Sequence, residues 1–241
     1  MGNLASLLWA KALHQQAEDL ERQALKLDEA TFGAESTQVA IRLNNLAQTL
    51  QSSNRLEEAE PMMRRALEIH EQSYGPDHPN FAIRLNNLAQ LLQATNRPEE
   101  AEPMMCRALE IHEQSYGPDH PSVAIDLNNL AQLLKATNRP GEAEPMMRRS
   151  LAIDEQSYGP DHPNVARNLN NLALLLQDTN RLEEAELMMR RALDITVDFK
   201  RLTGHEHPSY QGRRERYADV LRSMGRSEAE IAAALRAVGA S

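Results

Sequence analysis

The chain has 241 residues, of which 41% are hydrophobic and 25% are charged, so it can bury a substantial core and is not a disordered chain. Aromatic residues make up only 4% and the formal net charge is −9, which argues against nucleic acids and anionic membranes as partners. The single cysteine, Cys106, cannot form a disulfide within the chain, which indicates a reducing compartment.

The N-terminal segment carries no targeting signal and leaves an open end. Residues 1–15 lack the basic start and long apolar run of a signal peptide, and no apolar run approaches the roughly 18 residues of a membrane span. These features predict a cytoplasmic protein with no membrane partner. Several apolar residues lie close to this end: Leu4, Leu7, Leu8 and Trp9. Either the chain was cut from a longer protein or this end mediates self-association.

The rest of the chain is built from a repeated sequence. The string LNNLA begins at four positions spaced 42 residues apart: Leu43, Leu85, Leu127 and Leu169. Projection of this period in both directions predicts a single solenoid with six repeats, at approximately 1–42, 43–84, 85–126, 127–168, 169–209 and 210–241. The sixth repeat lacks LNNLA and follows an insertion of three residues, so we expect it to cap the array.

Each repeat contains two helical patterns separated by turns. In the third repeat the first helix carries an apolar stripe at positions i, i+3, i+4 and i+7: Leu85, Leu88, Ala89 and Leu92. The second helix carries Ala101, Met105, Ala108, Leu109 and Ile111. Gly117 suits a left-handed helix end and Pro118 stops its continuation, whereas Asp119 and Pro121 suit the cap and first turn of the next helix. No strand-like alternation is present, which predicts an all-α fold.

These positions have the relative spacing of the tetratricopeptide repeat (TPR) signature. The repeat LNNLAQLLQATNRPEEAEPMMCRALEIHEQSYGPDHP is similar to the 42-residue TPR variant of kinesin light chains, which also occurs in bacterial arrays fused to signalling ATPases or caspase-like proteases. The resemblance covers nearly the whole chain and implies an all-α, right-handed superhelical solenoid of antiparallel helix pairs that binds protein partners. The chain departs from the family in carrying methionine where the second helix often has an aromatic residue.

In a TPR superhelix, the side of the first helix opposite its apolar stripe lines the concave groove. Amide side chains there offer donors and an acceptor to an extended peptide backbone. The expected peptide-binding residues are Asn45, Asn87, Asn129 and Asn171, with Asn86, Asn128, Gln90 and Gln132 beside them. Ile83 and Ile125 would form shallow pockets for ligand side chains. The alternatives are that one asparagine of each pair bonds a neighbouring helix and that the isoleucines pack at helix starts.

Two arginines change the charge of this groove near its C-terminal end. Arg167 replaces the isoleucine of earlier repeats, and Arg216 falls on the asparagine position of the sixth repeat. An arginine pair can hold a carboxylate, an acidic side chain or a ligand C-terminus. Related chaperone-adaptor TPR domains clamp a terminal carboxylate at similar positions, although this chain lacks their first-repeat lysine. The alternative is that both arginines only keep a terminal cap in solution.

Other reactive residue types fit structural roles. The histidines that precede proline are expected to be turn residues: His78, His120, His162 and His207. The repeated methionine pairs fit core filling, and the repeated glutamate pairs complement helix dipoles. Cys106 stands where other repeats have arginine, so we expect an exposed, incidental thiol. The sequence therefore predicts no catalytic residue, no metal site and no cofactor, and the chain is not expected to be an enzyme.

The leading hypothesis is a protein-interaction scaffold that binds an extended peptide, with an acidic element, in its groove. A second hypothesis is self-assembly through the apolar N-terminal end. A third is a sensor segment of a larger signalling protein, with catalysis outside this chain.

Overall fold

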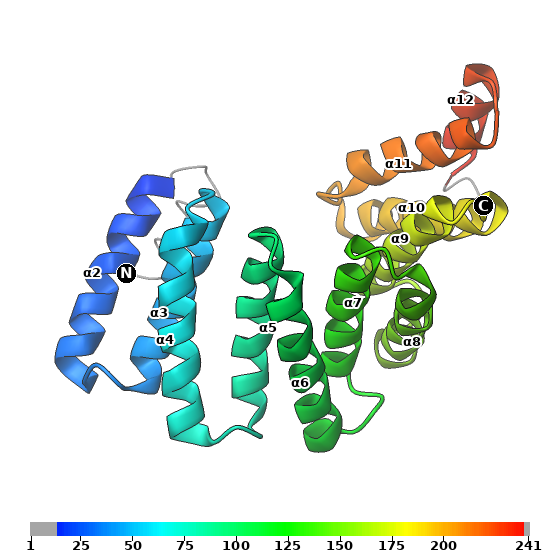
Figure 1. Cartoon of the computed structure of the whole chain (residues 1–241). Helices are drawn as coiled ribbons and strands as arrows, with labels where there is room; N and C mark the ends of the chain where they lie inside the picture. The colour runs from blue at the N-terminus through cyan, green and yellow to red at the C-terminus, as the bar shows by residue number, and fades with distance from the viewer. Residues whose placement is uncertain (1–13, 239–241) are drawn as a thin grey trace. The chain divides into compact units, whose positions relative to one another are not determined.

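The computed structural model describes residues 14–238, and in that range every regular element is an α-helix (Figure 1). The eleven described helices are α2 (His14–Phe32), α3 (Thr37–Ser52), α4 (Leu56–Tyr74), α5 (Pro79–Ala94), α6 (Pro98–Tyr116), α7 (Pro121–Ala136), α8 (Pro140–Tyr158), α9 (Pro163–Asp178), α10 (Leu182–Thr203), α11 (Tyr210–Ser223) and α12 (Glu228–Ala237). The all-α prediction is confirmed. The apolar N-terminal residues singled out above lie outside the described range: Leu4, Leu7, Leu8 and Trp9.

The helices form two compact units that divide between Pro118 and Asp119. In the N-terminal unit, α3 packs on α4 and α5 on α6, while α2 packs on α3 and α4 on α5. In the C-terminal unit, the same succession runs from α7 through α8, α9 and α10 to α11 and α12. Each helix therefore packs mainly on its neighbours in the chain, which is the arrangement of a solenoid of antiparallel helix pairs.

The predicted apolar stripes form the core. Leu88, Ala89 and Leu92 on α5 are fully buried, as are Ala101 and Met105 on α6. The small alanines let the paired helices approach closely, and the leucines and methionines fill the space that remains. The second methionine of each pair is buried, which confirms the core-filling role expected for Met63, Met105, Met147 and Met189.

Two kinds of turn connect the helices, and each requires a positive φ. Between α5 and α6, Asn96 has a φ of 59°, while the Arg97 backbone N–H donates to the Leu92 carbonyl at 2.9 Å. Asparagine tolerates this left-handed conformation better than most residues. At the end of α6, Gly117 has φ 89° and ψ 162°, a region that is essentially restricted to glycine. The predicted helix end at Gly117 is confirmed.

A histidine caps three of the helices that follow a glycine turn, α5, α7 and α9. His120 Nδ1 accepts a hydrogen bond from the Ser122 backbone N–H at 3.1 Å, so His120 is the N-cap of α7. The prediction that Asp119 supplies this cap was wrong, because Asp119 lies one residue outside the capping position. His78 and His162 cap α5 and α9 in the same way. The Tyr74 ring also stacks on His78, with ring centroids 4.6 Å apart, which orients the imidazole.

Polar pairs join the second helix of one repeat to the first helix of the next. Asp28 and Arg42 form an ion pair with a distance of 2.7 Å between Oδ2 and Nε. At the equivalent positions in the C-terminal unit, Asn168 Nδ2 donates to Asp154 Oδ2 at 2.9 Å. The last pair differs again, because Arg213 Nη1 donates to Thr196 Oγ1 at 2.7 Å. The repeat joints therefore lie at equivalent positions in the repeats but are formed by different types of polar pair.

Candidate functional site

The first helices of the four repeats that carry LNNLA each present a row of three residues spaced i, i+4 and i+7, opposite the buried stripe. We call these rows the asparagine face. In the N-terminal unit the rows are Ile41, Asn45 and Gln48 on α3, and Ile83, Asn87 and Gln90 on α5. In the C-terminal unit they are Ile125, Asn129 and Gln132 on α7, and Arg167, Asn171 and Leu174 on α9. Within each unit, successive first helices therefore present an apolar or basic side chain, then an amide, on the same side.

The exposure along these rows differs from residue to residue. Ile83 is 42% exposed and Ile125 is 46% exposed, which is unusual for isoleucine. Gln90 and Gln132 are also exposed, whereas Asn87 and Asn129 are half-buried. The asparagine face thus combines accessible apolar side chains with amide groups that lie partly between helices.

The asparagines also bond one repeat to the next. Asn87 Nδ2 donates to Asn44 Oδ1 at 2.8 Å, and Asn171 Nδ2 donates to Asn128 Oδ1 at 2.9 Å. The acceptor residues are buried, with Asn44 4% exposed and Asn128 5% exposed. Asn86 is buried as well. Asn44 and Asn128 are therefore mainly structural residues, and each accepts a hydrogen bond from the second asparagine of the following repeat.

Arg167 and Arg216 line one pocket between α9 and α11, which we call the arginine pocket. It has a volume of about 340 Å³ and is lined by Arg167, Asn170, Asn171, Pro208, Ser209, Gly212, Arg213 and Arg216. Arg216 Nη1 donates to Asn170 Oδ1 at 3.0 Å, which replaces the asparagine-to-asparagine bond of the earlier repeats. The sequence indicated Arg167 and Arg216 for this place but missed Arg213.

Arg213 is almost fully buried, and burial lowers the pKa of its guanidinium, with Arg216 lowering it further. The sequence patterns gave no signal for Arg213, because the equivalent positions of earlier repeats are not in the rows predicted to line the groove, and an insertion of three residues separates it from those repeats. With that insertion counted, Arg213 aligns with Asn168, which is also buried and hydrogen-bonded.

Arg167 is held only loosely. Its Nη2 atom lies 3.8 Å from Oδ2 of the buried Asp154, and 43% of the Arg167 side chain is exposed. Burial raises the pKa of Asp154, while Arg167 and the hydrogen bond from Asn168 lower it in part. Arg167 therefore has no short ion pair in the described part of the chain.

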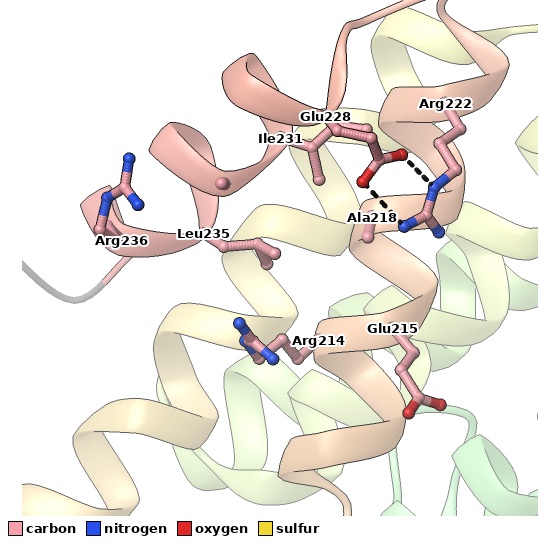
Figure 2. A pocket seen from close by; sticks show the side chains of 9 residues that line it. Arg214, Glu215, Ala218, Arg222, Glu228, Ile231, Leu235 and Arg236 are labelled. Atoms are coloured by element: carbon pink, nitrogen blue, oxygen red, sulfur yellow. Dashed lines mark hydrogen bonds and ion pairs between the residues drawn. The ribbon is translucent and has the colours of Figure 1, made fainter.

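A second pocket of about 360 Å³ lies between α11 and α12 (Figure 2). Ala218, Ile231 and Leu235 give it an apolar wall, and the Glu228 carboxylate pairs with Arg222 at 2.9 Å. Arg214 extends along the lower part of the same view. This pocket lies on the outer side of α11 and shares no lining residue with the arginine pocket.

The remaining candidates for chemistry are structural. Residues 14–238 contain no group of three or more His, Cys, Asp or Glu side chains that could hold a metal ion, and none of their helices could span a membrane. Cys106 is half-buried, so the prediction of an exposed thiol was wrong. An arginine at that position carries its charged head out to solvent, whereas the short cysteine side chain stays close to the helix.

The helix pairs, the left-handed asparagine turns and the asparagine face define a helical-repeat scaffold. The chain belongs to the tetratricopeptide repeat family, whose model matches residues 1–72, 41–114, 107–156 and 141–196. A search of curated proteins finds no match.

Two solved structures share the fold. One is a kinesin light chain-like protein of Podospora anserina with nearly identical TPR-like repeats, at 21% identity and a TM-score of 0.68 over 83% of this chain and 95% of that one. The other is BtubC (BKLC) from P. vanneervenii, at 22% identity and a TM-score of 0.70 over 93% of this chain and 85% of that one. The predicted TPR solenoid is therefore confirmed.

Proposed function

We propose that the protein is a non-catalytic, cytoplasmic scaffold that binds an extended peptide of a protein partner along the asparagine face. TPR repeats generally mediate protein–protein interaction, and the exposure of Ile83 and Ile125 beside amide side chains is the observation that supports this use here. Exposed apolar side chains on a polar surface commonly mark a site of interaction.

The proposed contacts divide between backbone and side chains of the ligand. Asn45, Asn87, Asn129 and Asn171 hold the peptide backbone, assisted by Gln90 and Gln132. Asn87 uses one Nδ2 hydrogen in its bond to Asn44, so its second Nδ2 hydrogen and its Oδ1 serve the ligand. Ile83 and Ile125 contact alternate ligand side chains. Arg167 and Arg216 favour a partner with an acidic element.

The test compares two variants that break the same hydrogen bond from opposite sides. Asn87→Ala removes the proposed ligand contact and the bond to Asn44, whereas Asn44→Ala removes that bond but leaves the Asn87 amide in place. Peptides selected from a random library are titrated against both variants by fluorescence anisotropy. We expect Asn87→Ala to weaken binding by about 5- to 10-fold, equivalent to one hydrogen bond, and Asn44→Ala by much less. Equal loss in both would overturn the ligand role of Asn87.

Self-association is the alternative function, and its proposed residues near the N-terminus are outside the described range. Light scattering across a concentration series separates the two functions. A monomer that binds library peptides supports the scaffold, whereas a concentration-dependent oligomer that binds none supports self-assembly.

A further inference from the structure

The arginine pocket presents hydrogen-bond donors almost exclusively. Asn170 Oδ1 already accepts from Arg216, and Asn171 Oδ1 accepts from Asn170 Nδ2 at 3.3 Å. No acidic side chain is among the residues that line it. A guanidinium carries five N–H donors and no acceptor, so the three arginines leave a surplus of donors. A complementary ligand must therefore supply oxygen acceptors.

Arg167 shows this surplus most directly. Its Nε and Nη2 atoms are buried and form no hydrogen bond within the part of the chain that the structure describes. The distance of 3.8 Å to Asp154 is longer than a hydrogen bond. Buried charged donors without an acceptor are costly, and a ligand oxygen in the pocket would reduce that cost.

The start of α11 adds to the positive potential of the pocket. Ser209 and Gly212 line the pocket at this helix start, and the Ser209 side chain makes no capping hydrogen bond. The first turn of α11 contains no acidic residue. The backbone N–H groups of Tyr210 and Arg213 already donate to the carbonyls of His207 and Ser209, so Gln211 and Gly212 supply the N–H groups that have no acceptor within the helix. Gly212 stands where earlier repeats have isoleucine, and a Cβ there would meet no atom within 4 Å. The site is therefore open as well as positive.

The charge balance distinguishes between acidic ligands. Among the described residues, three guanidinium groups line the pocket and one neighbouring carboxylate, Asp154, opposes them, so more than one positive charge remains. A carboxylate neutralises one charge, whereas a phosphoryl group carries about −1.5 to −2 at pH 7 and offers three acceptor oxygens. We infer that the arginine pocket binds the phosphoryl group of a phosphorylated peptide, an inference that rests on the peptide-binding function proposed above.

Two variants based on the other repeats test the pocket without disturbing the fold. Arg167→Ile restores the residue found at the equivalent positions Ile83 and Ile125. Arg216→Asn restores the asparagine of the earlier repeats, which can still donate to Asn170 as Asn171 donates to Asn128. Arg214→Ala is the matched control, because it removes one positive charge from the same helix but lines the other pocket.

The probes are three degenerate peptide libraries that differ only in a fixed central residue, which is serine, phosphoserine or aspartate. Members that bind are measured by isothermal titration calorimetry, with inorganic phosphate as competitor. We expect phosphoserine peptides to bind at least about 10-fold more tightly than the aspartate versions, since charge-assisted hydrogen bonds to the additional oxygens are worth that much. Arg167→Ile and Arg216→Asn each remove most of this preference, and Arg214→Ala changes it less than about 2-fold.

The outcomes separate this inference from the proposed function. Equal affinity for phosphoserine and aspartate peptides, or an equal loss in Arg214→Ala, would overturn the phosphoryl site while leaving peptide binding intact. Failure of all three libraries to bind would overturn the peptide-binding function and the inference with it.

Discussion

Asn87 on α5 donates its side-chain amide to Asn44 on α3, across the boundary between two repeats, over 2.8 Å. Because Asn44 is buried and Asn87 is half-buried, one bond joins the interior of the array to its candidate binding face. The same bond recurs between Asn171 and Asn128 at 2.9 Å. Ligand contact and repeat packing therefore share side chains, and tests of one must control for the other.

Loss of this bond should lower stability by a modest amount. Asn44→Ala removes a buried acceptor, and we expect the free energy of unfolding to fall by about 1 kcal/mol, the usual net value of one such hydrogen bond. Urea denaturation followed by far-UV circular dichroism measures the change. Gln48→Ala on the same helix is exposed and should stay within about 0.5 kcal/mol of the parent. Equal effects of the two substitutions would contradict a stabilising role for the bond.

Two Gly→Ala substitutions should change the free energy of unfolding in opposite directions. Gly117 has a φ of 89°, so Gly117→Ala should destabilise the protein by about 1–3 kcal/mol. Gly141 lies in the first turn of α8 with open space around it, and Gly141→Ala should stabilise by about 0.5–1 kcal/mol. Thermal and urea unfolding of both variants would show the contrast. A neutral Gly117→Ala substitution would mean that the turn tolerates an ordinary residue.

Acid should destabilise the N-terminal unit through His70. Burial, with Arg84 and His78 nearby, lowers the pKa of His70 to about 4. The unfolded chain, with an ordinary histidine pKa near 6.5, therefore binds a proton more readily than the folded one. Stability is complete above about pH 6.5 and falls as the pH decreases towards 4, by up to about 3 kcal/mol.

The measurement for His70 is the free energy of unfolding at pH 7.0 and pH 4.5, in the parent and in His70→Leu. The difference between the two proteins isolates the contribution of His70 from that of every other ionisable group. We expect the leucine variant to lose less stability on acidification. An identical pH dependence in both proteins would show that His70 is not responsible.

Replacing the Thr196 hydroxyl with a methyl group should lower the stability that the joint between Thr196 and Arg213 provides. Thr196→Val keeps the shape of the side chain but removes the oxygen that accepts from Arg213 Nη1 at 2.7 Å. Because Arg213 is buried, we expect a loss of about 1–3 kcal/mol in the free energy of unfolding. Thr203→Val, at an exposed position near the end of α10, is the control. A loss no larger than that of the control would show that water replaces the missing acceptor.

The regular part of the fold could be predicted because it follows from period and residue size. The spacing of Leu85, Leu88 and Ala89 identifies a helix with one buried side, and Gly117 identifies its partner's end, without reference to any other repeat. These are local properties, and they recur in the four repeats that carry LNNLA.

The partners of polar side chains could not be predicted in the same way. Asn44 and Asn45 are identical in type, and only the packing of successive helices decides that Asn44 becomes the buried acceptor for Asn87. His120 was recognised as a turn residue, but its role as a cap depends on a one-residue difference in where α7 begins. Arg213 was missed because its position is not in the rows predicted to line the groove, and its burial depends on how α11 packs on α10.

The repeat joints also restrict how such an array can evolve. The asparagine bond is the same at two of the joints, so a copy duplicated there would find a compatible neighbour at that point. The joint pairs Asp28–Arg42, Asp154–Asn168 and Thr196–Arg213 are not interchangeable, since a transposed copy would bring mismatched buried groups together. A few side chains at the joints therefore determine which repeats can be neighbours. Exchanging the positions of two repeats would lower the stability of the array, even though the repeat sequences are nearly the same.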